Sequence, residues 1–115
     1  MESCVFCKIV NKEMPKEFLM ETDDVFVFAD IYPSAPIHYL VVPKKHISSI
    51  KEMSHDDEAL LGHLIHTAKE AAEKLKLEGY KLVFNVGKGG GQIVDHLHLH
   101  ILGGWDINKT NTINI

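Results

Sequence analysis

The segment His96-Leu97-His98-Leu99-His100 places three histidines at every second position. Because side chains alternate between the two faces of a strand, this spacing predicts three imidazole rings on one face. Leu97, Leu99 and Ile101 then point to the opposite face, over a hydrophobic core. An unperturbed imidazole titrates near neutral pH, so such a row can supply a nucleophile, a proton donor and a proton acceptor, or a set of metal ligands.

Four further short runs are rich in β-formers and are bounded by turn residues. With the histidine strand, the runs expected as strands are Phe18 to Glu21, Val25 to Ala29, Tyr39 to Pro43, Tyr80 to Val86 and Val94 to Leu102. The first three follow one another closely enough to form a meander. The pattern favours an antiparallel sheet in a single α+β domain over residues 1–115.

Two helices are expected beside the sheet. Apolar residues recur at helical spacing from Leu60 to Leu75, with Ser54 and Asp57 as a capping start and Gly79 as a stop. A shorter helix is expected from Val5 to Val10, before Pro15. The histidines beside the long helix, His55, His63 and His66, are interpreted as solvated.

Composition narrows the range of functions. The chain of 115 residues carries 12 basic and 16 acidic residues, a formal net charge of −4, and all of its cations are lysines. It lacks the basic excess that nucleic-acid binding needs, and without arginine a phosphate has to be held by backbone N–H groups, lysine or histidine. No apolar run of about 18 residues and no signal-peptide pattern is present, so we expect a soluble, cytoplasmic protein without a membrane partner.

A glycine-rich loop, Gly87 to Gln92, directly precedes the histidine row. Consecutive glycines let backbone N–H groups approach a bound anion, so a phosphate can sit between this loop and the rings. The alternative is a flexible hairpin connection. For the histidines, the alternatives are hydrogen-bonded rings on a half-exposed strand, or zinc ligands. Cys4 and Cys7 leave redox exchange or metal binding open.

The row and the residues after it, His96 to Gly104, resemble the histidine triad motif of the Hint-type histidine triad (HIT) nucleotide-binding proteins. The likeness covers residues 3 to 104, and the shared segments are Cys4-Val5-Phe6-Cys7-Lys8-Ile9-Val10, Asp30-Ile31, Pro36-Ile37-His38, Val42-Pro43-Lys44-Lys45-His46-Ile47 and Gly90-Gly91-Gln92. This resemblance implies a homodimer whose five-stranded antiparallel sheets join across the interface, with one long and one short helix per subunit. It also implies a purine nucleotide, of the AMP or GMP type, beside each triad.

The resemblance implies roles for individual side chains. His98 would be the nucleophile that attacks the α-phosphorus of a nucleoside phosphoramidate to form a nucleotidyl-histidine. His100 would donate to a phosphate oxygen or the leaving group, and His38 would complete the proton relay. Asp30 would accept from ribose hydroxyls, while Asn85, Gln92 and backbone groups such as that of Gly91 would hold phosphate. Apolar residues would surround the base, namely Val5, Phe6, Ile9, Phe28 and Ile31.

One residue and one segment depart from the family pattern. Ile93 replaces the Ser or Thr with which many relatives hydrogen-bond the substrate, and the segment from Trp105 to Ile115 does not match the carboxy terminus of the animal proteins. Activity and leaving-group preference are therefore the least constrained properties. A dinucleoside polyphosphate hydrolase and a nucleotide-binding or interaction protein with little turnover remain alternatives to a purine nucleoside phosphoramidase.

The resemblance also implies a metal site. In some microbial relatives, two early thiolates, a histidine after Pro-Lys-Lys and the first triad histidine bind zinc, which corresponds to Cys4, Cys7, His46 and His96. Two sulfurs and two imidazoles complete a tetrahedral structural zinc site. His96 would then be structural, and two inert thiols are the alternative.

Overall fold

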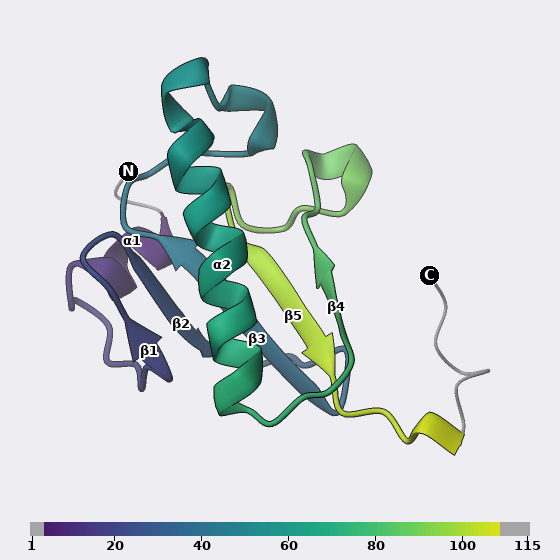
Figure 1. The fold of residues 1–115 in the computed structure, drawn as a ribbon. Helices are drawn as coiled ribbons and strands as arrows, with labels where there is room; N and C mark the ends of the chain where they lie inside the picture. Colours follow the sequence, from purple (N-terminus) through teal and green to yellow (C-terminus); the bar gives the residue numbers. More distant parts are fainter. Residues whose placement is uncertain (1–3, 109–115) are drawn as a thin grey trace.

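A computed structural model describes residues 4–108 of the chain (Figure 1). The helices and strands, in chain order, are α1 (Val5–Val10), β1 (Met20–Glu21), β2 (Val25–Ala29), β3 (Ile37–Pro43), α2 (Glu58–Lys74), β4 (Tyr80–Val83) and β5 (Leu99–Gly103). Three single turns of 3-10 helix accompany them, at Ile50–Glu52, His55–Asp57 and Lys88–Gly90. No helix in this part of the chain is long and apolar enough to span a bilayer.

The strands form one antiparallel sheet in the order β1-β2-β3-β5-β4. The first three strands are the expected meander. After α2 the chain returns at the far edge as β4, and β5 then inserts between β3 and β4. The expected α+β fold, with a five-stranded antiparallel sheet and one long helix, is confirmed.

Helix α2 lies across one face of the sheet (Figure 1). Its residues Leu64, Ala68 and Ala71 are fully buried against the side chains that the strands direct to that face. Those strand residues include Val27, Val41, Leu99 and Ile101. Burial of this apolar surface is the main force that holds the long helix to the sheet.

The opposite face carries α1. Phe6 and Ile9 of this short helix pack with a second buried cluster whose strand members are Phe26, Phe28, Leu40 and Val42. Neighbouring residues of β2 and β3 thus serve different cores, as the alternation of side chains along a strand requires. The histidine row belongs to the α1 face, because Phe6 packs edge-on against both His96 and His98.

The histidine segment is not a strand over its whole length. We expected a strand from Val94, but β5 begins only at Leu99. β3 and β5 pair up to Val41 and Leu99, and β3 runs on to Pro43 without further pairing to β5. Pro43 has no N–H to donate and its carbonyl accepts from His96 Nε2 (2.8 Å), while Leu97 N–H donates to Ile47 O (2.6 Å) instead of to β3. The alternation of faces persists, since Leu97 lies in the α2 core.

Of the other helices and strands, some have the expected bounds and others end at a different residue. Helix α1 and strand β2 match the expected ranges, whereas β4 ends at Val83 rather than at residue 86. Helix α2 stops at Lys74, before the expected Gly79, because Lys76 adopts a left-handed conformation (φ 60°) and turns the chain. At its start, the carboxylate of Asp57 accepts from the backbone N–H of Ser54 (2.9 Å), as the capping pattern predicts.

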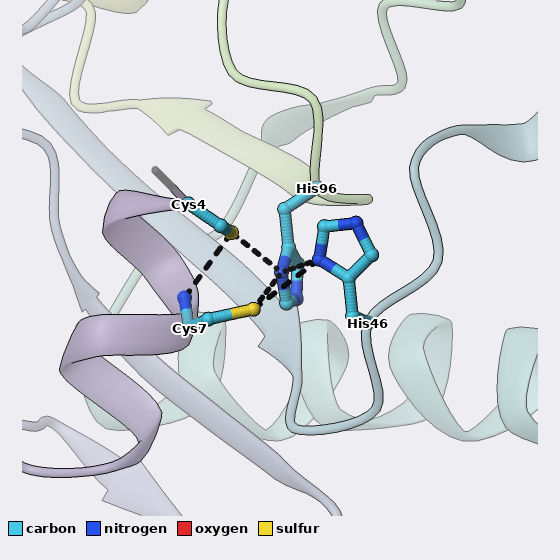
Figure 2. Close-up of side chains that lie close together, drawn as sticks. All are labelled: Cys4, Cys7, His46 and His96. Carbon is cyan, nitrogen blue, oxygen red and sulfur yellow. Dashed lines mark hydrogen bonds between the residues drawn. The ribbon is translucent and has the colours of Figure 1, made fainter. Parts of the chain in front are cut away.

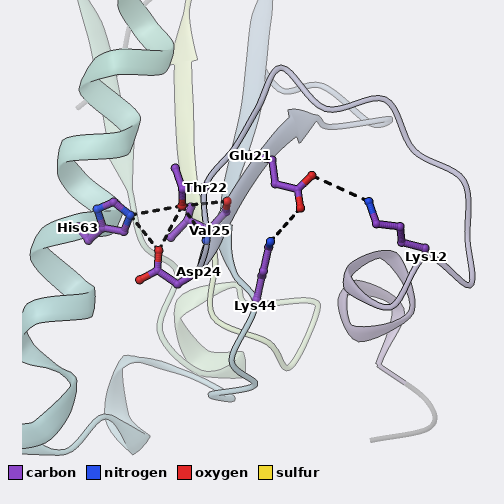
Figure 3. A network of polar contacts seen from close by, with 7 residues as sticks. All are labelled: Lys12, Glu21, Thr22, Asp24, Val25, Lys44 and His63. Atoms are coloured by element: carbon purple, nitrogen blue, oxygen red, sulfur yellow. Dashed lines mark hydrogen bonds and ion pairs between the residues drawn. The ribbon is translucent and has the colours of Figure 1, made fainter.

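Polar contacts join α2 to the turn between β1 and β2 (Figure 3). His63 Nε2 of the helix lies 3.0 Å from Asp24 Oδ1, and Thr22 Oγ1 accepts from Val25 N–H within the turn (3.0 Å). On the other side of the same turn, Lys44 Nζ lies 2.8 Å from Glu21 Oε2. His63 therefore has a structural partner and is not simply solvated.

Candidate functional site

A cavity of about 490 Å³ opens on the α1 face of the sheet, a size suited to a small-molecule ligand. Ten of the eleven residues expected to bind nucleotide line it, Gln92 being the exception. The cavity is lined by residues that are far apart in the sequence. They come from α1, from β2 and the loop after it, from the segments on either side of the 3-10 turn Lys88–Gly90, and from the histidine segment. The lining residues that were expected are Val5, Phe6, Ile9, Phe28, Asp30, Ile31, Asn85, Gly91, His98 and His100.

His98 is the buried imidazole at this cavity. Its Nδ1 lies 2.7 Å from the backbone carbonyl oxygen of His96. A carbonyl has no proton to give, so Nδ1 carries the hydrogen and donates, which leaves the lone pair on Nε2. Burial lowers the pKa of His98, although the hydrogen bond to His96 opposes this effect. The ring is therefore neutral at pH 7, the form in which an imidazole is a nucleophile.

A hydrogen-bonded pair of histidines lies beside it. Ser34 N–H donates to His38 Nδ1 (2.9 Å), so the proton of a neutral His38 is on Nε2. His38 Nε2 lies 2.8 Å from His100 Nδ1 and donates to it. The proton of His100 is then on its own Nε2, a buried atom that hydrogen-bonds to nothing in residues 4–108.

This unpartnered donor points to a missing acceptor. A buried N–H without a partner costs about 1–3 kcal/mol, and such groups in native proteins are usually satisfied by a ligand or water. The rings of His98 and His100 are adjacent, with centroids 4.9 Å apart. His98 and His100 therefore place a lone pair and an unpartnered N–H donor on neighbouring rings of the cavity lining.

Asp30 lies on the other side of His38. Its Oδ2 is 3.4 Å from His38 Nε2, and its Oδ1 accepts from Tyr32 N–H (2.8 Å). Burial lowers the pKa of His38 more than the Asp30 carboxylate raises it. Burial and the two neighbouring histidines lower the pKa of His100 to about 4. Both rings are consequently neutral at pH 7 until an anion enters and favours their protonated forms.

The glycine loop is organised by Gln92. Its Oε1 accepts from Gly87 N–H (2.9 Å), and its Nε2 donates to the carbonyls of Ser48 (2.6 Å) and Val94 (2.9 Å). Because these bonds occupy the amide inside the protein, Gln92 is not among the cavity-lining residues, unlike the other residues expected to hold the nucleotide. Asn85 does line the cavity, while its Nδ2 donates to Gly90 O (3.0 Å).

Some cavity residues were not expected from the sequence. They are Met14, Pro15, Lys16, Ala29, Tyr32, Leu40 and Val94. Leu40 could have been found by pairing β3 with β2, where it lies opposite Phe28. Met14, Pro15 and Lys16 lie in an irregular connection that no periodicity marks. Ile93, the noted departure from the family pattern, also lines the cavity and is 89% exposed.

A second cluster lies at the start of α1, where Cys4, Cys7, His46 and His96 point toward one another (Figure 2). Cys4 Sγ lies 3.3 Å from His96 Nδ1, Cys7 Sγ lies 3.2 Å from His46 Nδ1, and the two Nδ1 atoms are 3.1 Å apart. Ligands of a tetrahedral zinc ion are separated by about 3.3–3.8 Å, given bond lengths of about 2.0–2.3 Å. The four donor atoms therefore have the spacing of a zinc site.

The tautomer of His96 also fits a metal. Its Nε2 lies 2.8 Å from the carbonyl oxygen of Pro43 and must donate to it, so the lone pair on Nδ1 faces the two sulfurs. A backbone carbonyl in this position orients a metal-binding histidine. The backbone carbonyl of His96 accepts from His98, which lines the cavity. His96 therefore connects the cluster to the cavity.

The chain matches the family model described as "Scavenger mRNA decapping enzyme C-term binding" over residues 3–111. An uncharacterized HIT-like protein of Synechococcus elongatus is 45% identical, with 90% of this chain and 91% of that protein covered. The chain belongs to the HIT family.

Solved structures agree with this family assignment. A HIT family hydrolase of Legionella pneumophila superposes with a TM-score of 0.85 at 46% identity, covering 91% of this chain and 96% of that one. A HIT family hydrolase of Clostridium thermocellum superposes with a TM-score of 0.89 at 41% identity, covering 93% and 95%. The expected family is thus confirmed, and the fold is that of HIT hydrolases.

Proposed function

We propose that this HIT protein is a purine nucleoside phosphoramidase of the Hint type, acting through a nucleotidyl-His98 intermediate. The observation that carries the proposal is the tautomer of His98: Nδ1–H is held by the His96 carbonyl, so the unprotonated Nε2 is available at the cavity. The neighbouring His100 Nε2–H, a buried donor without a partner in residues 4–108, supplies the contact for a phosphoryl oxygen.

The reaction has two displacements at phosphorus. In the first, His98 Nε2 forms a bond to the α-phosphorus and the phosphorus–nitrogen bond breaks, with His100 Nε2–H donating to a phosphoryl oxygen or to the departing nitrogen. In the second, water attacks phosphorus and the His98–phosphorus bond breaks. The leaving amine gains one proton and the water loses one, so the His38–His100 relay ends as it began.

The nucleoside would occupy the rest of the cavity. The apolar surfaces of Phe6 and Phe28 offer a slot for a base, and Asp30, with an oxygen near His38, offers an acceptor for ribose hydroxyls. Dinucleoside polyphosphate hydrolysis uses the same nucleophile and is the competing enzymatic function. Nucleotide binding with little turnover is the non-enzymatic one, which the apolar Ile93 favours.

Incubation with adenosine or guanosine 5′-phosphoramidate should give a burst of amine and a phosphorus-linked adduct on His98. The variant His98→Ala should lose the adduct, and hydrolysis should fall by several orders of magnitude because no nucleophile replaces the ring. Intact-mass spectrometry of the quenched enzyme would detect the adduct. The matched control is His66→Ala, which removes an exposed ring of α2 outside the cavity.

Three results would contradict this assignment. An adduct that survives in His98→Ala would place the nucleophile elsewhere. Faster release of mononucleotide from a diadenosine polyphosphate than from the phosphoramidates would favour the competing hydrolase. Tight nucleotide binding without release of mononucleotide from either kind of substrate would favour the binding protein.

We further propose that Cys4, Cys7, His46 and His96 hold a structural zinc ion. Their donor spacing and the His96 tautomer support this proposal. When bound, zinc would fix the start of α1 against the histidine segment, with no part in the chemical step. Two reduced thiols suit a reducing compartment, and we infer a cytoplasmic location.

Protein purified without added metal should contain about one zinc per chain. Removal of zinc by a chelator should lower the melting temperature, because binding free energy is added to folding free energy. Cys7→Ser should reproduce this loss, whereas Ser49→Ala, a buried polar site outside the cluster, should retain the metal. A metal-free preparation with an unchanged melting temperature would contradict the proposal.

We also propose a homodimer joined along β4. Within residues 4–108, β4 is the last strand of the sheet, with β5 as its strand neighbour, and Leu82 on this edge strand is partly exposed. Antiparallel pairing of two β4 strands would continue the sheet across the interface. Sedimentation velocity should give the mass of two chains, and a monomer at micromolar concentration would contradict the proposal.

A further inference from the structure

Lys16 is the one residue of fixed positive charge among those lining the cavity in residues 4–108. It lies half-buried in the connection between α1 and β1, with its Nζ 5.1 Å from the centre of the Phe28 ring. The ammonium group therefore lies at the aromatic end of the cavity, over the face of Phe28.

The ammonium of Lys16 has no carboxylate partner in the described part of the chain. In contrast, Lys12 and Lys44 both pair with Glu21, at 4.0 Å and 2.8 Å (Figure 3). A half-buried cation that is paired only with an aromatic face keeps its hydrogen-bond donors for a ligand. Lys16 is thus a candidate ligand contact, and Lys12 is not.

The position of Lys16 identifies which part of a nucleotide it meets. Phe28 pairs with Leu40, and Leu40 pairs with His100, so the three residues lie in one row across β2, β3 and β5. Neighbouring strands are about 4.8 Å apart, which puts Phe28 about 10 Å from His100. This span is comparable to that from the 5′-phosphate to the far edge of the base in a mononucleotide.

Between the Phe28 end and the His100 end of the cavity, aromatic side chains offer a surface for a base. Phe6 packs edge-on against His98 on one side and against Phe28 on the other, with ring centroids 5.1 Å and 5.7 Å apart. With the phosphate at His98 and His100, a purine would lie over these rings, and one of its edges would lie beside Lys16, whose Nζ is 5.1 Å from the centre of the Phe28 ring. Asp30 also lines the cavity within residues 4–108, but its carboxylate lies 3.4 Å from His38 Nε2.

A lysine ammonium donates hydrogen bonds and accepts none. Guanine and hypoxanthine present O6 and N7, two acceptors on one edge, whereas adenine has an amino donor at position 6. We propose that the edge of a bound purine that carries C6 faces Lys16, which makes this cavity selective for 6-oxopurine nucleotides over adenine nucleotides. This inference rests on the proposed function, since it assumes that the phosphate occupies the His98–His100 end.

The test is the affinity of GMP, IMP and AMP, measured by isothermal titration calorimetry on the full-length protein. Wild type should bind GMP and IMP about tenfold more tightly than AMP, the effect of one charge-assisted hydrogen bond. Lys16→Met keeps the stem over Phe28 but removes the donors, so the three affinities should become equal. Lys16→Arg should restore the preference, and Lys12→Met, the matched control, should leave it unchanged.

The binding results distinguish the role of Lys16 from the proposed phosphoramidase function. Equal affinities in wild type, or a preference that survives in Lys16→Met, would overturn the role of Lys16 and leave the proposed function intact. Preference for GMP without preference for IMP would also overturn it, because the 2-amino group would then be the feature recognised. Failure of all three nucleotides to bind would overturn the proposed function and the role of Lys16 together.

Discussion

The chemistry proposed for this protein depends on the hydrogen bond from His98 Nδ1–H to the carbonyl oxygen of His96 (2.7 Å). That bond decides which nitrogen of a neutral ring has the lone pair and fixes the plane of the ring. The carbonyl is itself held in place, because the ring of His96 is bonded to Pro43 O at one nitrogen and faces the cysteine cluster with the other. The cluster at the start of α1 thus supports the nucleophile through one residue.

Hydrophobic burial brings these groups together. The leucines between the histidines pack under α2, and this packing turns His96, His98 and His100 toward α1. On that side, Phe6 contacts both His96 and His98, so the same short helix covers the cavity and supplies two cysteines to the cluster. The two cores that stabilise the fold are therefore also what positions the cavity and the metal ligands on one face.

Much of this arrangement was predictable from the sequence because it follows from periodicity. The alternation of His96 to His100 predicted the common face, and helical spacing predicted α2. Features that depend on tertiary neighbours were not predictable. The histidine strand starts late because Pro43 has no N–H to donate and Leu97 N–H bonds to Ile47 O instead. Gln92 turns inward because Ser48 O and Val94 O lie within its reach. Lys16 could not be predicted as a cavity residue, because it lies in an irregular segment and only the fold brings its ammonium over Phe28.

The most direct test of the central claim is the protonation of the ring nitrogens, measured by ¹⁵N NMR of the histidine side chains near pH 7. The account predicts that His98 carries its proton on Nδ1 with a bare Nε2, and that His38 and His100 carry theirs on Nε2. Assignments would come from the spectra of single-histidine variants. A His98 ring protonated at Nε2 would contradict the account, since no lone pair would then face the cavity.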